Sequence, residues 1–442
     1  WSGAPGVQGS PAFTLTDNLP LVTGAVLIGG TAGDTTTRPV LRSANPSGAL
    51  GLWLRAGRVV IKNLILRGFD PGIEIQGATT VIVQDTRIES GPSGSSGEGI
   101  YSCTNVTVDT LRLDHTVMLG DSSRTAVYFG GCGSNIGARV VDVRDSKILR
   151  WGDGLYFYEV DSTAVLRSEI SDNDGYGVSL AQEISVNPSL YVAHSRLERN
   201  YYGAIRNDNA RRVVVDTSVI LATQDDAINS SGGCGECSGD TYTQVRLHGD
   251  TIRLLANGYD WLRAFLVDTA IIDQTVVLFS DSASHFGYGN LHARVARVTN
   301  SQFLGLGQGQ ILQFQGGDFF ADNVTLTGCS QPVPGCDGAY GLYLNIGAAA
   351  LDARVRNSSF TRIAYPVSSS LNQPGVIEAT NLTMDSVISG IQVGGDSIVI
   401  RNNIVTRASN FAISADGVIS ARGSTISNNT VGCVPALAFT NG

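Results

Sequence analysis

One short pattern recurs along the chain and limits the folds that the chain can adopt. Each copy is a run of β-branched residues, then Asp or Asn with a small polar residue, and then a second apolar run. Such a copy predicts a strand, a corner of one or two residues, and another strand. The copies lie at residues 81–88, 106–113, 141–148, 213–220, 271–277, 355–360 and 398–405.

A third apolar run precedes most copies and usually begins with a small residue. The first six of these small residues are Gly72, Gly99, Ala126, Gly154, Gly177 and Gly203, separated by 27, 27, 28, 23 and 26 residues. A repeat of this length cannot bury its own apolar face, which is typical of a solenoid. Three strands per repeat predict an all-β fold, a single right-handed parallel β-helix of roughly fifteen coils.

The repeat also sets the predicted domain organisation. We expect an N-terminal cap and first coil in residues 1–50, the parallel β-helix in 51–432, and a C-terminal tail or cap in 433–442. A cap is expected because an open strand edge invites pairing with another chain. Four longer segments interrupt the rhythm and are expected to be loops on one flank, at residues 91–98, 230–244, 281–285 and 330–340.

Charge and hydropathy exclude several classes of partner. The net charge is −9 and no basic run occurs, which argues against nucleic acid. No apolar stretch of about 18 residues is present, so no membrane span is predicted. The sequence begins at Trp1 rather than Met, from which we expect a processed, secreted product, extracellular or at the cell surface.

Seven cysteines favour an oxidising compartment. Their positions predict three disulfide pairs and leave Cys433 over. Another interpretation of the second pair is half of a zinc site, but neither a second Cys pair nor a spaced His pair accompanies it. The predicted pairs are Cys103 with Cys132, Cys234 with Cys237, and Cys329 with Cys336.

Equivalent residues of a parallel β-helix stack about 4.8 Å apart, so the sequence can be written as columns. The first column is the Asp or Asn corner. We interpret it as a ladder of side chains bonded to neighbouring backbone, and the alternative is a row of ligands or acids. Its members are Asn63, Asp85, Asp109, Asp145, Asp216, Asp273, Asn300, Asn357 and Asn402.

A second column, just before the opening run of each coil, contains the candidate catalytic residues. Two carboxylates one coil apart repel each other, which raises the pKa of one, as a general acid requires. Such pairs hydrolyse glycosidic bonds. The alternative is a row of surface turn residues. The predicted row is Asp226, Asp260 and His285, with Asp225 and Arg263 alongside.

The outward positions of the opening runs carry aromatic, amide and guanidinium groups that suit a sugar chain laid across the coils. The alternative is that tyrosine simply has a high β-propensity on a half-exposed sheet. The candidate substrate-binding residues are Tyr156, Tyr158, Tyr202, Arg206, Asn229, Trp261, Tyr288, Gln313 and Tyr343.

The repeat, together with residues 13–30 (FTLTDNLPLVTGAVLIGG), resembles secreted bacterial β-helix proteins of the pectin-lyase-like superfamily. That resemblance implies the fold more strongly than an activity. Asp225-Asp226-Ala-Ile-Asn229 is similar to the Asp-Asp motif of polygalacturonase-like hydrolases. Residues 200–203 (NYYG) stand where an Asn-Thr-Asp motif is expected, and His285 lies in Ser-His-Phe rather than Gly-His-Gly.

Lyases of the superfamily use Arg or Lys as a base beside a carboxylate cluster that binds Ca²⁺. The resemblance would give that role to Arg206 or Arg263. It would make Asp153, Asp172 and Asp174 the Ca²⁺ ligands, although their spacing matches no ligand loop. We predict no cofactor from the residues themselves.

The sequence therefore predicts a secreted carbohydrate-active protein that binds a polysaccharide along its opening runs. If it is an enzyme, Asp225, Asp226 and Asp260 would be acid and base or nucleophile, in a cleft walled by loops. The alternative is a non-catalytic structural, adhesive or filament-forming protein. That protein would self-associate through apolar surfaces at residues 1–20 and 431–442.

Overall fold

The structure is a computed structural model. It describes residues 12–15, 21–23, 26–29, 38–44, 49–55, 57–90, 97–102, 107–130, 137–158, 160–181, 188–208, 210–222, 224–231, 243–255, 260–279, 288–306, 310–328, 339–344, 351–369, 375–415, 424–432 and 437–439. Every regular element in these ranges is a β-strand. In the part of the chain that the structure describes, we find no helix of the length and apolarity that crossing a membrane requires.

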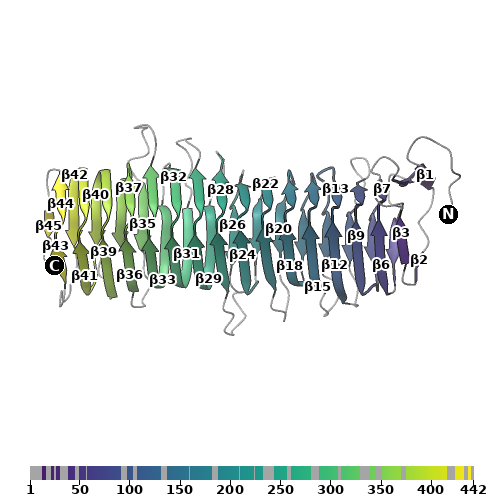
Figure 1. Ribbon diagram of the computed structural model, residues 1–442, viewed down its shortest axis with the longest axis horizontal. Coiled ribbons are helices and arrows are strands. Elements are labelled where there is room, and N and C mark those ends of the chain that lie inside the picture. Colours follow the sequence, from purple (N-terminus) through teal and green to yellow (C-terminus); the bar gives the residue numbers. More distant parts are fainter. Residues whose placement is uncertain are drawn as a thin grey trace. The chain divides into compact units, whose positions relative to one another are not determined.

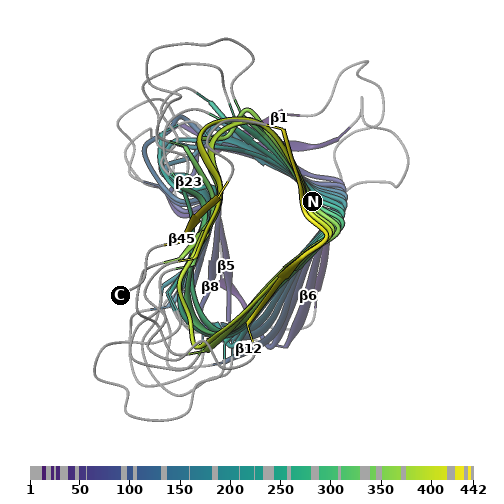
Figure 2. The same ribbon diagram turned by 90° about the vertical axis from the view of Figure 1, so that its left-hand side faces the viewer.

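The chain consists of two compact units, Trp1–Arg212 and Val213–Gly442. Each unit is a parallel β-solenoid, and each coil contributes an opening, a middle and a closing strand in chain order. Strands of successive coils overlie one another along three sides (Figures 1 and 2). The predicted all-β parallel solenoid is therefore confirmed, with a number of coils that differs slightly from the prediction.

In the first unit the three kinds of strand form three parallel sheets. The opening sheet contains β2 (Leu21–Val22), β5 (Leu52–Leu54), β8 (Ile73–Ile75), β11 (Ile100–Ser102), β14 (Val127–Phe129), β17 (Leu155–Phe157), β20 (Tyr176–Leu180) and β23 (Gly203–Asn207). The middle sheet contains β3 (Val26–Gly29), β6 (Arg58–Lys62), β9 (Thr80–Gln84), β12 (Val108–Asp114), β15 (Ala138–Arg144), β18 (Val160–Leu166) and β21 (Ser189–Ala193). The closing sheet contains β1 (Ala12–Leu15), β4 (Val40–Ser43), β7 (Ile65–Arg67), β10 (Arg87–Glu89), β13 (Val117–Leu119), β16 (Lys147–Leu149), β19 (Glu169–Ser171) and β22 (Arg196–Asn200).

The second unit uses the same order, but several strands run through a corner without a break. β29 (Asp260–Asp273), β31 (Tyr288–Thr299) and β33 (Gln310–Asp322) serve as opening and then middle strands. β40 (Thr383–Val393) and β42 (Ile404–Ala415) serve as closing and then opening strands.

The remaining strands of the second unit belong to one sheet each. The opening sheet adds β26 (Ile228–Ser231), β35 (Tyr340–Leu344), β38 (Tyr365–Ser369) and β45 (Leu437–Phe439). The middle sheet adds β24 (Arg212–Asp216), β27 (Gln244–His248), β36 (Leu351–Arg356), β39 (Gly375–Thr380), β41 (Ser397–Arg401) and β43 (Thr425–Ser427). The closing sheet adds β25 (Val219–Ala222), β28 (Thr251–Leu254), β30 (Val276–Phe279), β32 (Gln302–Leu306), β34 (Thr325–Gly328), β37 (Ser359–Thr361) and β44 (Thr430–Gly432).

Alternation along each strand builds the core. In β9, Val81 and Val83 are fully buried, while Thr80, Ile82 and Gln84 are half-buried on the outer side. Because successive side chains of a strand point to opposite faces, the β-branched runs of the repeat stack in columns inside the coil.

The small residue before each opening strand allows two coils to approach closely. A Cβ placed on Gly154 would lie 2.4 Å from the carbonyl oxygen of Gly177 in the next coil. Real Cβ atoms essentially never lie closer than about 3 Å to another atom. The distance between the two backbones therefore requires glycine at this position. The periodic small residue of the sequence is thus a packing requirement.

The prediction that Asp or Asn occupies the corner is confirmed at six positions and wrong at three. Asn63, Asp85, Asp145, Asn300, Asn357 and Asn402 have positive φ angles of 47–56°, the left-handed conformation that Asn and Asp tolerate. In the other three coils the positive φ belongs to His115, Thr217 and Gln274 rather than to Asp109, Asp216 and Asp273. Asp216 and Asp273 each precede the corner by one residue, whereas Asp109 lies near the start of β12, where its N–H donates to the carbonyl oxygen of Thr79 (2.8 Å).

The hydrogen-bonded ladder that we predicted for the corner is made chiefly by the residue after it. In the first unit the backbone N–H of Thr116 donates to Ser146 Oγ (3.0 Å), that of Ser146 to Ser168 Oγ (3.1 Å), and that of Ser168 to Ser195 Oγ (3.1 Å). All four side chains are buried. The corner side chains themselves also form short amide ladders in the second unit, as when Asn323 Nδ2 donates to Asn300 Oδ1 (2.9 Å).

Several predictions fall outside the described residues. The six cysteines of the three predicted disulfides lie outside the ranges given above, and so does Cys433. So do most of residues 1–20 and of 433–442, which carry the predicted cap, tail and self-association surfaces. Those predictions remain predictions.

Candidate functional site

The structure brings Asp226 and Asp260 together in the second unit. β26 pairs with β29 so that Asn229 lies opposite Arg263, and the N–H of Ala227 donates to the carbonyl oxygen of Asp260 (2.7 Å). The predicted register holds across these two coils.

The contacts of Asp226 are those of a residue that caps the neighbouring coil. Its Oδ1 accepts the backbone N–H of Asp260 (3.2 Å), and its Oδ2 accepts Asn229 Nδ2 (3.1 Å). The Arg263 guanidinium is 3.8 Å from the same Oδ2. Burial, with the nearby charge of Asp225, raises the pKa of Asp226 to about 6, and Arg263 opposes that rise. The residue is only 3% exposed, and Oδ1 accepts from the backbone of the neighbouring coil rather than facing an open surface.

The prediction that His285 is the third member of the row is wrong. Asp260 pairs with Tyr288 and Arg263 with Asn290, so Tyr288 occupies the next position of the row. His285 comes three residues earlier and lies outside the described residues. The inserted segment before β31 changes the register, which the sequence spacing does not reveal.

The prediction that Trp261 binds substrate on the outer face is also wrong. Its indole is fully buried, lies 5.3 Å from the ring of Phe303, and donates from Nε1 to the carbonyl oxygen of Ile311 (2.8 Å). A Cβ on Gly289 would lie 2.5 Å from the indole ring, so this glycine makes room for it. Trp261 therefore belongs to the core and cannot contact a ligand on the outer face.

Four of the other candidates form one outward column on the opening sheet of the second unit. Successive pairings join Asn229, Arg263, Asn290, Gln313 and Tyr343. Their side chains range from half-buried to exposed. Asn290 is the member that the sequence missed, because its coil follows an insertion. The column offers amide and guanidinium groups suited to hydrogen bonding.

A tyrosine column covers the opening sheet of the first unit. Tyr101, Tyr128 and Tyr156 pair in register, with ring centroids 5.5 and 5.7 Å apart and interplanar angles of 15° and 7°. The hydroxyl of Tyr156 donates to that of Tyr158 (3.1 Å), and burial raises the pKa of Tyr156. The sequence identified only Tyr156 and Tyr158, although Tyr101 and Tyr128 occupy the same place in their opening runs.

The tyrosine column ends at a hollow. The residue opposite Tyr156 in the next coil is Ser179, and the residue after that is Arg206. A cavity of about 290 Å³ opens beside Tyr156 at this end of the column. Its lining consists of Gly152, Asp153, Tyr156, Asp174, Gly175, Tyr176, Tyr202 and Arg206. The structure thus gathers three of the predicted ligand-binding residues, Tyr156, Tyr202 and Arg206, at one place.

Aromatic and charged groups are ordered around this hollow. The rings of Tyr176 and Tyr202 are 5.8 Å apart, and the Arg206 guanidinium lies 5.6 Å from the centre of the Tyr176 ring. Arg206 also bonds Asp208 (2.8 Å). Asp153 accepts the backbone N–H of Tyr176 (2.7 Å), and burial raises its pKa. Tyr202 is half exposed, so the hollow is open to a ligand.

Of the three carboxylates that the resemblance would assign to Ca²⁺, Asp153 and Asp174 line the hollow, but Asp172 is not among its lining residues. Asp172 bonds Arg199 through both oxygens (2.6 and 2.8 Å), which lowers its pKa, and Asp153 bonds backbone. Within the described ranges, one group of three metal-ligating side chains meets, namely Asp114, His115 and Asp145. There Arg167 already bonds both oxygens of Asp145 (2.8 and 2.6 Å).

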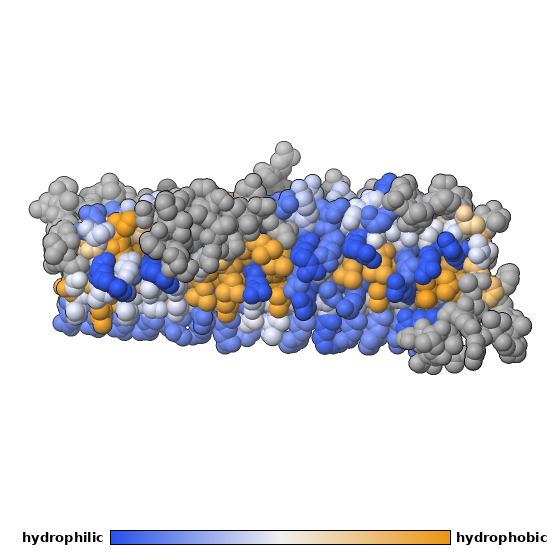
Figure 3. Space-filling view, turned by 90° about the horizontal axis from the view of Figure 1, so that it is seen from above, coloured by the Kyte–Doolittle hydropathy of each residue, from blue (hydrophilic) through white to orange (hydrophobic). Residues whose placement is uncertain are grey.

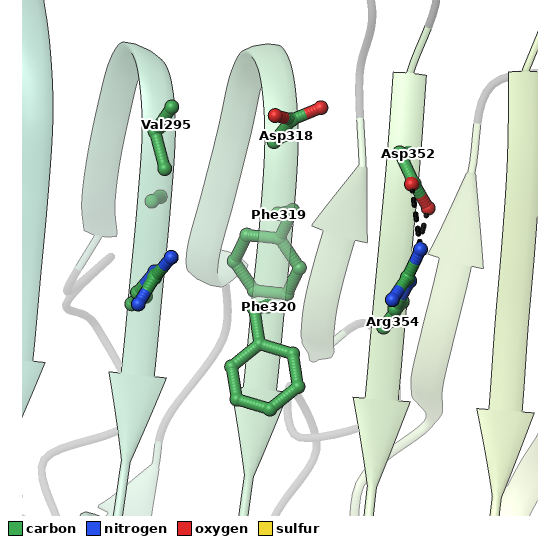
Figure 4. Close-up of a pocket in the computed structure, with 8 residues that line it drawn as sticks. Val295, Asp318, Phe319, Phe320, Asp352 and Arg354 are labelled. Atoms are coloured by element: carbon green, nitrogen blue, oxygen red, sulfur yellow. Dashed lines mark hydrogen bonds and ion pairs between the residues drawn. The ribbon is translucent and has the colours of Figure 1, made fainter.

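A second hollow, of about 360 Å³, lies on the middle sheet of the second unit. Figure 4 shows Asp352 and Arg354 of β36 pointing toward one another, with Asp318 and Phe320 on the neighbouring β33. The Asp352–Arg354 ion pair is 2.9 Å long. Since these charges pair with each other, this hollow offers a ligand less than the one beside Tyr156.

The closing sheet is a poorer candidate. On the side where the closing strands lie, hydrophobic and hydrophilic patches alternate (Figure 3). In the first unit its outward charges pair across coils, as Lys147 does with Glu169 (2.8 Å). Its outward apolar residues, such as Val117 and Leu149, are half-buried and aliphatic.

No protein-family model matches the chain, and no curated protein sequence matches it. The resemblance to the pectin-lyase-like superfamily therefore remains a prediction, and the site must be interpreted from its own geometry.

Proposed function

We propose that this protein binds a polysaccharide on the opening sheet of its first unit, with one sugar ring in the hollow beside Tyr156. The observation that supports this most directly is the tyrosine column that ends at an open, aromatic-lined hollow. Ligand sites are usually concave and aromatic, with a few convergent polar groups.

Each part of the site would have a different task. Tyr101 and Tyr128 stack on their neighbours, so they would contribute ring edges and hydroxyl groups rather than free faces. Tyr156 lines the hollow, where its side chain would contact the C–H groups of a sugar. Asp153 and Arg206 would fix the orientation of the ring through its hydroxyl groups.

The proposal is limited to binding and to an extracellular location, where long polysaccharides are met. Asp226 was a candidate acid, but its two oxygens are engaged by the Asp260 backbone and by Asn229. Those contacts favour a structural role over a reaction, so no step is proposed for it.

The test is titration calorimetry and affinity electrophoresis with a panel of soluble polysaccharides. We expect at least one polymer to bind, and we expect Tyr156→Ala and Tyr202→Ala each to weaken it by about tenfold, which is about 1.4 kcal/mol. Tyr191→Ala is the matched control, because Tyr191 is 41% exposed on the middle sheet of the same unit. The proposal is wrong if no polymer binds, or if Tyr156→Ala and Tyr202→Ala weaken binding no more than Tyr191→Ala does.

A further inference from the structure

We infer that the ligand of this face is a neutral polysaccharide and that a polyuronate is excluded from it. The inference rests on the proposed function and names the chemical class of its ligand. It comes from the charges along the tyrosine column and around the hollow.

Acidic groups accompany the column over its length. Glu74 lies opposite Tyr101 in the pairing of β8 with β11. Glu98 precedes β11, and Asp153 and Asp174 line the hollow. Burial raises the pKa of Tyr101, and the negative charges of Glu98 and Glu74 raise it further, so both carboxylates act on the column.

Each positive group near the face contacts an acid or an aromatic ring. Arg206 bonds Asp208 through two nitrogens (3.2 and 2.8 Å) and lies over the ring of Tyr176. Arg124 is 3.7 Å from Glu98, and the Arg55 guanidinium lies 5.7 Å from the centre of the Trp53 ring. Among the described residues named on this face, the five acids Glu74, Glu98, Asp153, Asp174 and Asp208 outnumber the three arginines, so negative charge is in excess.

A polyuronate carries one carboxylate on each sugar. Bringing that row of charges against Glu74, Glu98 and Asp174 places like charges next to each other, which weakens binding. A neutral sugar brings hydroxyl groups, which donate to the carboxylates and accept from the tyrosine hydroxyls without this cost. A cationic amino sugar would compete with Arg206, which already occupies the aromatic face of Tyr176.

The experiment compares matched polymers. The full chain is titrated with dextran, soluble β-glucan, galactomannan and arabinogalactan, and with polygalacturonate and chitosan. The neutral polymer that binds most tightly is then oxidised at its primary hydroxyl groups to carboxylates, and the titration is repeated at about 20 mM and about 500 mM salt. At the lower concentration charges act over roughly 20 Å, and at the higher over roughly 4 Å.

We expect a neutral polymer to bind with an affinity that salt hardly changes. The oxidised form should bind about tenfold more weakly at low salt, and the difference should narrow at high salt because repulsion is screened. Equal or tighter binding of the oxidised form, preference for polygalacturonate or chitosan, or a difference that salt does not alter would each overturn this inference while leaving polysaccharide binding in place. Failure of every polymer to bind would instead remove the proposed function.

Discussion

At the residue scale, Asp250 is a charged residue in a column of hydroxyl groups. It follows the corner residue Gly249, just as Ser218 and Thr275 follow the corner residues of the adjoining coils. Its oxygens accept the backbone N–H groups of Ser218 (2.8 Å) and His248 (2.9 Å), and it is 1% exposed. Burial raises its pKa from 3.8 to about 7, more than the two hydrogen bonds lower it.

This shift predicts a pH dependence of stability. Because the folded state holds the proton of Asp250 more tightly than the unfolded state, the free energy of unfolding should fall as pH rises from about 4 to about 7 and then level off. Asp250→Asn, which copies Asn403 of another coil, should remove this component. Each pKa unit corresponds to about 1.4 kcal/mol, so a loss of a few kcal/mol is expected at most.

Urea denaturation of the wild type and of Asp250→Asn between pH 4 and pH 8 measures the difference. Asp318→Asn is the control, since Asp318 is an exposed carboxylate of the same unit. A wild-type profile that is parallel to that of Asp250→Asn would show that Asp250 ionises normally in the folded protein.

The hydroxyl of Ser146 supports a second prediction at this scale. It accepts the N–H of Thr116 (3.0 Å) and donates to the carbonyl oxygen of Arg144 (2.6 Å), and the residue is 2% exposed. Ser146→Ala leaves a buried N–H without its acceptor, so we expect a loss of about 1–3 kcal/mol in the free energy of unfolding.

Ser123→Ala is the comparison for Ser146, because Ser123 is exposed and its hydroxyl donates to nearby Asp121. It should change the free energy of unfolding by less than about 0.5 kcal/mol. Equal effects of the two substitutions in thermal and urea denaturation would contradict a stabilising role for the buried ladder.

At the scale of the element, the distance between coils depends on the small residues that open them. Gly154→Ala puts a methyl group 2.4 Å from the Gly177 carbonyl oxygen and 2.6 Å from Ile170 Cγ2. Overpacking of this kind typically costs about 1–3 kcal/mol, and β17 and β20 would have to move apart.

Gly432→Ala gives the matched measurement at a position with space, since the nearest atom would be 3.7 Å away. We expect it to leave the denaturation midpoint nearly unchanged or to raise it slightly. A Gly154→Ala protein as stable as Gly432→Ala would mean that the coils tolerate a wider spacing than their pairing indicates.

At the scale of the whole molecule, each coil contacts mainly its neighbours, and a solenoid therefore transmits damage over short distances. Within the first unit, Gly154→Ala should increase amide hydrogen exchange most in β14, β17 and β20, which surround the altered corner. Protection in β5 and β8, several coils away, should change little.

Hydrogen exchange read by mass spectrometry tests this directly on the full chain. The same measurement on Gly432→Ala sets the baseline for unaffected coils of the first unit. A uniform loss of protection from β5 to β23 would show that the unit opens as one cooperative body rather than coil by coil.

The sequence by itself determined the repeat, and with it the parallel solenoid, the inward β-branched residues and the small residue at each opening strand. These features are local: period-two alternation and a spacing of about 26 residues suffice. It also identified Tyr156, Tyr202 and Arg206 as surface residues of the opening sheet, and Asp226 as the neighbour of Asp260.

The tertiary structure alone decided which residues of different coils meet. Insertions change the number of residues per coil, so the neighbour of Asp260 is Tyr288 rather than His285, and the corner after β12 is His115 rather than Asp109. The side chain of Trp261 lies in the core, where Gly289 leaves space for the indole. Contacts between coils join residues more than twenty positions apart, and one shifted register changes them all. The hollow beside Tyr156 likewise combines residues of three coils, such as Asp153, Tyr176 and Arg206, and only their register brings them together.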